Sequence, residues 1–156
     1  MPLKLVVRRW VSFAAQDFGK DGSESFEDCG IPEAARFLAA GLQHPNVSLR
    51  DPENRGDWAY AFTGTVSARP FEVLVASTDE ERPYVACITF TGRLFERGQR
   101  LQTDLSDAMN LLCALVHAVL QADHRISNIR WHTDEGWETP NQPWQATPET
   151  LPPVFT

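Results

Sequence analysis

The stretch that decides the fold runs from residue 58 to residue 91 and reads WAYAFTGTVSARPFEVLVASTDEERPYVACITFT. Three segments within it, 58–62, 71–76 and 84–90, are rich in the aromatic and β-branched residues that favour β-strands. The segments are joined by SARP and TDEERP, short polar connections whose residues favour turns. Short connections bring consecutive strands together antiparallel. The stretch therefore predicts a three-stranded antiparallel meander.

Two amphipathic helices are predicted on either side of the meander. The first covers residues 31–42, where Pro32 suits the first turn and apolar residues recur at helical spacing. The second covers residues 105–122, with Thr103 or Asp104 as its N-cap. Only a narrow strip of the second helix is polar, which indicates that most of it is buried against the sheet.

One further strand is predicted before the first helix, over residues 3–13, and one after the second helix, over residues 127–132. The order of elements is then β-α-β-β-β-α-β. This order favours an α+β domain of two layers, in which both helices pack on one face of a mainly antiparallel sheet.

The pattern leaves open which face of the 58–62 strand is buried. Trp58, Tyr60 and Phe62 share one face, and the two alanines between them share the other. The three rings either form the core or make an exposed patch, and exposed apolar patches usually mark interfaces.

A single domain is predicted over residues 1–136, followed by an extended tail over residues 137–156. The tail contains five prolines, which rule out regular structure but suit a polyproline-like conformation. The tail is expected to be anchored on the domain by its large apolar residues, which are Trp137, Trp144, Leu151 and Phe155.

Composition restricts the classes of function. The net charge of −7 argues against a protein that binds nucleic acid or an anionic membrane, because phosphate groups attract a basic surface. The three cysteines have no CxxC spacing, so a disulfide framework or zinc site is not expected. The chain lacks the pattern of a signal peptide and any apolar run of about 20 residues that could span a bilayer. A soluble cytoplasmic protein is expected.

Two groups of residues could carry chemistry. Cys113 and His117 lie four residues apart on the second helix, as a thiolate–imidazolium pair would require, but no orienting acid accompanies them. His132 lies close to Asp134 and Glu135, but no second histidine provides the converging ligands of a metal site. Glycine-rich phosphate loops and nucleophile elbows are absent from the sequence. We therefore expect no enzyme, no cofactor and no metal, and interpret both groups as structural.

Acidic residues collect in two stretches, 17–33 and 134–138, and tryptophans accompany the second stretch. If both stretches lie at one end of the sheet, they form an acidic patch with aromatic anchors, which suits a basic protein partner. The predicted partner-binding residues are Asp17, Asp21, Glu24, Glu27, Asp28, Trp131, Asp134, Glu135, Trp137 and Glu138.

Short motifs give the chain a resemblance to a group of small bacterial α+β proteins. These motifs are HPNV at 44–47, GDWAYAF at 56–62, LQADHRI at 120–126 and IRWH at 129–132. Those proteins resemble the immunity proteins of polymorphic toxins in size, in a helix followed by Arg-Trp and in a tail rich in Trp and Pro. The resemblance implies an inhibitor that binds a cognate toxin and occludes its active site, and it transfers no catalytic residue.

A second hypothesis is a secretion chaperone or adaptor. Such proteins are also small, acidic and α+β, but they dimerise and hold a segment of a secreted effector against an apolar surface. The mass of the protein in solution and the product of the neighbouring gene separate the two hypotheses.

Overall fold

The computed structural model describes residues 10–15, 30–56, 59–77, 84–91 and 99–132. In chain order its elements are β1 (Trp10–Ala15), α1 (Ile31–Gly41), β2 (Val47–Leu49), β3 (Glu53–Asn54), β4 (Ala59–Val66), β5 (Arg69–Ala76), β6 (Tyr84–Phe90), α2 (Gln99–Ala122) and β7 (Ile126–His132).

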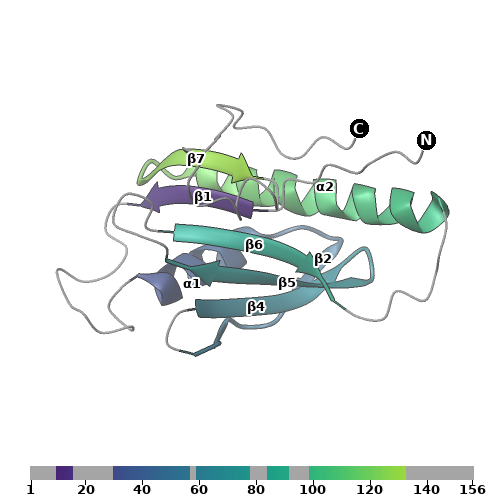
Figure 1. Ribbon diagram of the computed structural model, residues 1–156, viewed down its shortest axis with the longest axis horizontal. Coiled ribbons are helices and arrows are strands. Elements are labelled where there is room, and N and C mark those ends of the chain that lie inside the picture. Colours follow the sequence, from purple (N-terminus) through teal and green to yellow (C-terminus); the bar gives the residue numbers. More distant parts are fainter. Residues whose placement is uncertain (1–9, 16–29, 57–58, 78–83, 92–98, 133–156) are drawn as a thin grey trace, which may run out of the picture.

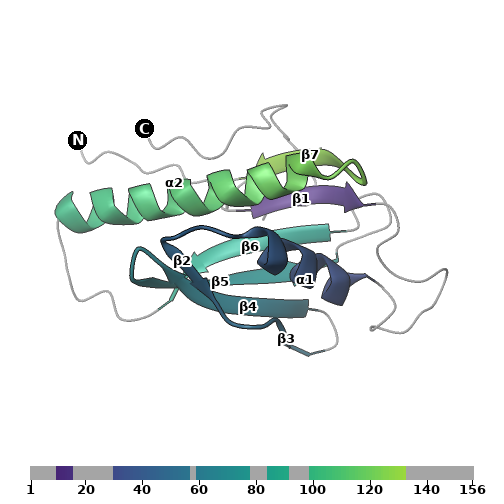
Figure 2. The same cartoon turned by 180° about the vertical axis from the view of Figure 1, so that it is seen from behind.

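The strands form one antiparallel sheet in the order β2-β4-β5-β6-β1-β7, and the short strand β3 also pairs with β4. Figure 1 shows the sheet in front, and Figure 2, from behind, shows both helices lying on the same face. The predicted α+β architecture and the predicted meander of β4, β5 and β6 are thus confirmed. The last strand pairs with β1 and forms one edge of the sheet.

The hairpin between β4 and β5 is tighter than the predicted SARP turn. Val66 pairs with Arg69, so only Ser67 and Ala68 lie outside the ladder, and both have positive φ, 48° and 66°. Two consecutive residues with positive φ are the signature of the type I′ turn, whose twist matches that of the flanking strands. Here the turn is made without the usual glycine or asparagine.

The two faces of β4 have different surroundings. Phe62 and Val66 are fully buried and belong to the main core between the sheet and the helices, and Tyr60 packs beside them. The aromatic face of this strand is therefore the core face, while Trp58 lies outside the described residues. Ala59 faces the other way and belongs to a separate small apolar cluster.

Helix α1 closely matches the predicted range and packs against α2 through its last residue. A Cβ added to Gly41 would lie 2.6 Å from Cγ1 of Val119, which is tighter than side chains tolerate. Glycine at this position therefore permits the close approach of the two helices. At the other end, Gly30 provides the N-cap position with a φ of 87° and no side-chain cap.

Helix α2 begins at Gln99, six residues before the predicted start at 105. The prediction that Thr103 or Asp104 caps the helix is therefore wrong. The residues from Gln99 to Gln102 are all good helix formers, and the last glycine before them is Gly98. Thr103 and Asp104 therefore lie inside the helix, because residues 99–102 before them contain no glycine or proline that would end it.

Both edges of the sheet are irregular. At one edge, β2 has three residues and β3 has two. Strands this short are not predicted from the sequence, because they contain too few residues to show an alternation of apolar and polar side chains. At the other edge, two residues of β7, Asn128 and Ile129, oppose the single residue Phe13, and Asn128 has a φ of 56°. Short edge strands and bulges hinder edge-to-edge pairing of sheets.

Several predictions concern residues outside the described ranges. These are the beginning of the first strand (3–9), the acidic loop and the tail (137–156). They stay predictions.

Candidate functional site

Trp131 is the only predicted partner-binding residue within the described ranges, and the structure places it in the core. Its side chain is fully buried between α2 and the sheet. The prediction that Trp131 anchors a partner is therefore wrong, because a buried ring offers no surface for contact. The others, which all lie outside the described residues, are Asp17, Asp21, Glu24, Glu27, Asp28, Asp134, Glu135, Trp137 and Glu138.

The topology also bears on the two acidic stretches. Strands β1 and β7 are antiparallel neighbours, with Ala15 paired to Ile126 and Trp10 paired to His132. The first acidic stretch follows Ala15 and the second follows His132, so the chain enters them from opposite ends of this strand pair. Residues 17–29 and 134–138 lie outside the described ranges, so the single acidic patch stays a prediction.

Trp131 instead connects β7 to α2 through His117. The indole Nε1 donates a hydrogen bond of 3.1 Å to Nδ1 of His117, whose side chain is 8% exposed. Because Nδ1 accepts this bond, the neutral imidazole carries its proton on Nε2. Burial lowers the pKa of His117. The histidine thus serves as a neutral acceptor inside the fold.

The neighbouring thiol lies in the core. Cys113 lies one turn before His117 and is fully buried. Burial raises the pKa of the Cys113 thiol far above its usual range. A thiol kept protonated is a poor nucleophile, which agrees with the structural interpretation of this pair.

The His117–Trp131 contact predicts a loss of stability in mild acid. The folded-state pKa of His117 is lowered, so below pH about 6.5 the unfolded chain binds a proton that the folded protein excludes. The free energy of unfolding, measured in urea, should therefore fall between pH of about 7.5 and about 5.5. In His117→Gln, whose amide oxygen can accept the indole hydrogen bond without titrating, this fall should be smaller.

Asp123 does not interfere with this measurement. Hydrogen bonds from Arg125 lower the pKa of Asp123 to about 2, so the stability that it contributes is lost only in stronger acid, below its ordinary pKa. Equal pH dependence in the His117→Gln variant and the unchanged protein would contradict the assigned role of His117.

His132 belongs to β7 and lies on the sheet face opposite the helices. Its Nε2 is 2.8 Å from Oγ of Ser12 on the adjacent strand, and both residues are 3% exposed. This contact could not be predicted from local sequence patterns, because the two residues are 120 positions apart. Serine and histidine at this distance can form an activated nucleophile, but Ser12 is too deeply buried for a substrate to reach. We interpret the pair as two buried polar groups that satisfy each other.

The face of the sheet opposite the helices, which we call the helix-free face, has an apolar half. Ala59, Ala76 and Val85 are buried there and form a cluster. Trp10 and Leu74 pack against this cluster and are partly buried. The register explains the arrangement, because Leu74 pairs with Cys87 and Cys87 pairs with Trp10.

The other half of the helix-free face is polar. Thr63 and Thr65 alternate with the core residues of β4 and therefore point away from the helices. Thr63 pairs with Glu72, which accepts a hydrogen bond of 3.0 Å from Arg55. Arg55 also contacts Glu53 at 3.0 Å, so these three charges form a small ionic cluster.

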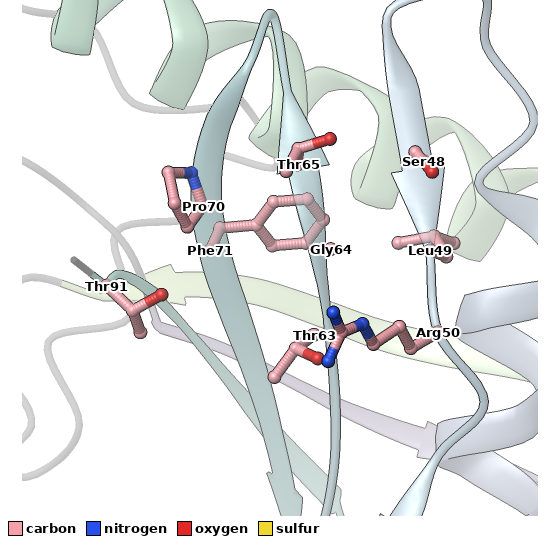
Figure 3. Close-up of a pocket in the computed structure, with 9 residues that line it drawn as sticks. All are labelled: Ser48, Leu49, Arg50, Thr63, Gly64, Thr65, Pro70, Phe71 and Thr91. Atoms are coloured by element: carbon pink, nitrogen blue, oxygen red, sulfur yellow. The ribbon is translucent and has the colours of Figure 1, made fainter.

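A shallow groove of about 430 Å³ lies where β2, β4 and β5 run side by side (Figure 3). Its polar lining comes from Ser48, Arg50, Thr63, Thr65 and Thr91. Leu49, Gly64, Pro70 and Phe71 complete it. Figure 3 shows the side chain of Arg50 reaching across to Thr63. The groove could not be predicted from the sequence, because its wall is formed by β2, a strand that the sequence pattern does not predict.

Within the described part of the chain, no three His, Cys, Asp or Glu side chains gather as a metal site would require. Across the same residues, no helix combines the length and the apolar character needed to span a bilayer. Comparison with protein-family models, with curated proteins and with solved structures finds no match.

Proposed function

We propose that this protein is an immunity protein, which binds a cognate bacterial toxin and occludes the toxin's active site. The observation that carries the proposal is the helix-free face of the sheet. Its apolar half combines a partly buried tryptophan, Trp10, with Leu74 over a floor of small side chains. A tryptophan on an apolar patch with a polar rim is typical of the anchor of a protein–protein interface.

The charge of the protein supports a basic partner. The net charge is −7, and an acidic surface increases the rate at which a basic protein associates. The resemblance to immunity proteins points in the same direction. In this proposal Trp10 replaces Trp131 as the aromatic anchor, because Trp10 is the one of the two that reaches the surface.

The test uses the toxin encoded by the neighbouring gene. Co-expression should yield a stable complex and protect the cells, and Trp10→Ala should weaken binding about 30-fold or more, as truncation of a hot-spot residue does. Leu74→Arg, which places a charge on the same face, should also weaken binding. Arg36→Ala is the matched control, because Arg36 is exposed on α1 on the other side of the sheet. Affinity is measured by calorimetry, and unfolding curves show that each variant is folded.

Two outcomes would contradict the proposal. If the neighbouring gene encodes no toxin and no complex forms, the protein is not an immunity protein. If the protein is instead a stable dimer that binds a secreted effector, the chaperone hypothesis replaces it. Binding that survives both Trp10→Ala and Leu74→Arg but is lost in Arg36→Ala would place the interface on the helix side.

A further inference from the structure

We propose that the groove at β2, β4 and β5 binds a carboxylate group, with Arg50 as the cation and the threonine hydroxyls as additional donors. The groove lies on the polar half of the helix-free face and is not part of the apolar patch around Trp10. Its volume of about 430 Å³ is within the range of sites that hold small ligands.

Arg50 lies at the groove and has no ionic partner among the described residues. The side chain is exposed, and its guanidinium forms no hydrogen bond or ion pair with any described residue. Two other arginines of the described part do have ionic partners: Arg55 contacts two glutamates, and Arg125 contacts Asp123 at 2.8 Å. No described residue therefore competes with a ligand for the guanidinium donors of Arg50.

The backbone around Arg50 is held in a regular ladder. The Arg50 N–H donates a hydrogen bond of 2.9 Å to the carbonyl oxygen of Thr63, and Ser48 pairs directly with Thr65. Figure 3 shows Thr63 beside the guanidinium, while Ser48 and Thr65 lie farther along the two strands. At the far side, the Thr91 N–H donates to the carbonyl oxygen of Pro70 at 3.0 Å, which brings a further hydroxyl to the groove.

The charge balance favours a carboxylate over a phosphate. A guanidinium matches the planar, singly charged carboxylate with two parallel hydrogen bonds. A phosphate carries more negative charge and would meet Glu72, which pairs with Thr63. Arg55 contacts both Glu53 and Glu72 at 3.0 Å, so this cluster carries one negative charge. Among the described residues, the guanidinium of Arg50 is the one cation that lines the groove. A singly charged anion suits this balance better than a phosphate.

The carboxylate has two possible sources, a free small acid or an Asp or Glu side chain of the protein partner. The first source does not depend on the proposed function. The second would extend the interface from the apolar half of the helix-free face to its polar half.

The experiment titrates the isotope-labelled protein with succinate and, separately, with inorganic phosphate at constant ionic strength, and follows amide and arginine signals by NMR. Succinate should cause saturable shifts at Arg50, Thr63 and Thr65. Arg50→Gln should weaken this binding about tenfold or more, since charge-assisted hydrogen bonds are lost. Arg36→Gln, at an exposed arginine outside the groove, should leave it unchanged.

A second arm measures the affinity of Arg50→Gln for the toxin. Weakened binding to both succinate and the toxin assigns the carboxylate to the partner, and weakened binding to succinate alone assigns it to a small acid. Shifts that do not saturate, that persist in Arg50→Gln, or that are stronger with phosphate would overturn the proposal. None of these results depends on Trp10, so failure of this inference is distinguishable from failure of the proposed function.

Discussion

Replacing Trp131 with alanine is expected to lower the free energy of unfolding by about 3–5 kcal/mol, the cost of removing a large aromatic side chain from a core. Trp131 is fully buried among residues of α2 and the sheet. Its removal leaves a cavity and also leaves Nδ1 of His117 without its donor. The loss is measured by urea denaturation of the purified variant.

Two variants separate these contributions. Trp131→Phe keeps most of the ring but removes the indole N–H, so it should cost about 1–3 kcal/mol for the unsatisfied acceptor together with a smaller packing loss. Trp10→Ala is the matched tryptophan control. Trp10 lies on the neighbouring strand β1, where it pairs with His132 on the helix-free face. Its replacement should lower the free energy of unfolding less, because Trp10 is only partly buried. A Trp131→Ala protein of unchanged stability that fails to bind the toxin would restore Trp131 as a partner anchor.

Replacing Gly64 with alanine is expected to destabilise the protein by about 2–3 kcal/mol, the upper part of the range for overpacking. A Cβ at this position would overlap the backbone carbonyl oxygen of Ser48 on β2. A backbone atom in a strand ladder cannot rotate away, so β2 must move away from β4. Urea denaturation gives the loss, and hydrogen exchange should show faster opening at Val47–Leu49.

A second substitution in the same hairpin should have the opposite effect on stability. Ala68 occupies a left-handed position with a φ of 66°, where glycine is unstrained. Ala68→Gly should therefore stabilise the hairpin by about 1 kcal/mol, while Gly64→Ala destabilises it. Retained protection of β2 in Gly64→Ala would show that the two strands do not need this close contact. Because β2 carries Ser48 and leads into Arg50, the variant should also weaken succinate binding.

Local sequence determined the type of almost every long element. The alternation of residues in 71–76 and 84–90 is readable because each strand has one face toward the helices, and periodicity reports burial. The same reasoning identified α1, whose proline start and apolar stripe lie within a few residues of each other. The order of these elements was enough to predict an α+β sheet with both helices on one face.

The tertiary structure decided how residues far apart in the chain meet. The sequence marked Trp131 as a surface anchor because tryptophan is common in interfaces, but the strand register turns its ring toward α2 and His117. Ser12 and His132 meet only because the first and last described strands are neighbours. The groove at Arg50 depends on β2, a strand of three residues that is formed by pairing with β4.

The physical reason is the range of the interactions involved. Strand and helix propensities, turn residues and apolar periodicity act over a few neighbouring residues, so the sequence by itself determined the elements and the overall acidic charge. The buried side of each tryptophan, the pairing of polar groups and the shape of the groove are set by contacts between strands distant in the chain. Those contacts form only in the folded protein. They bury Trp131 in the core and leave Trp10 partly exposed, which is why Trp10 is the proposed anchor.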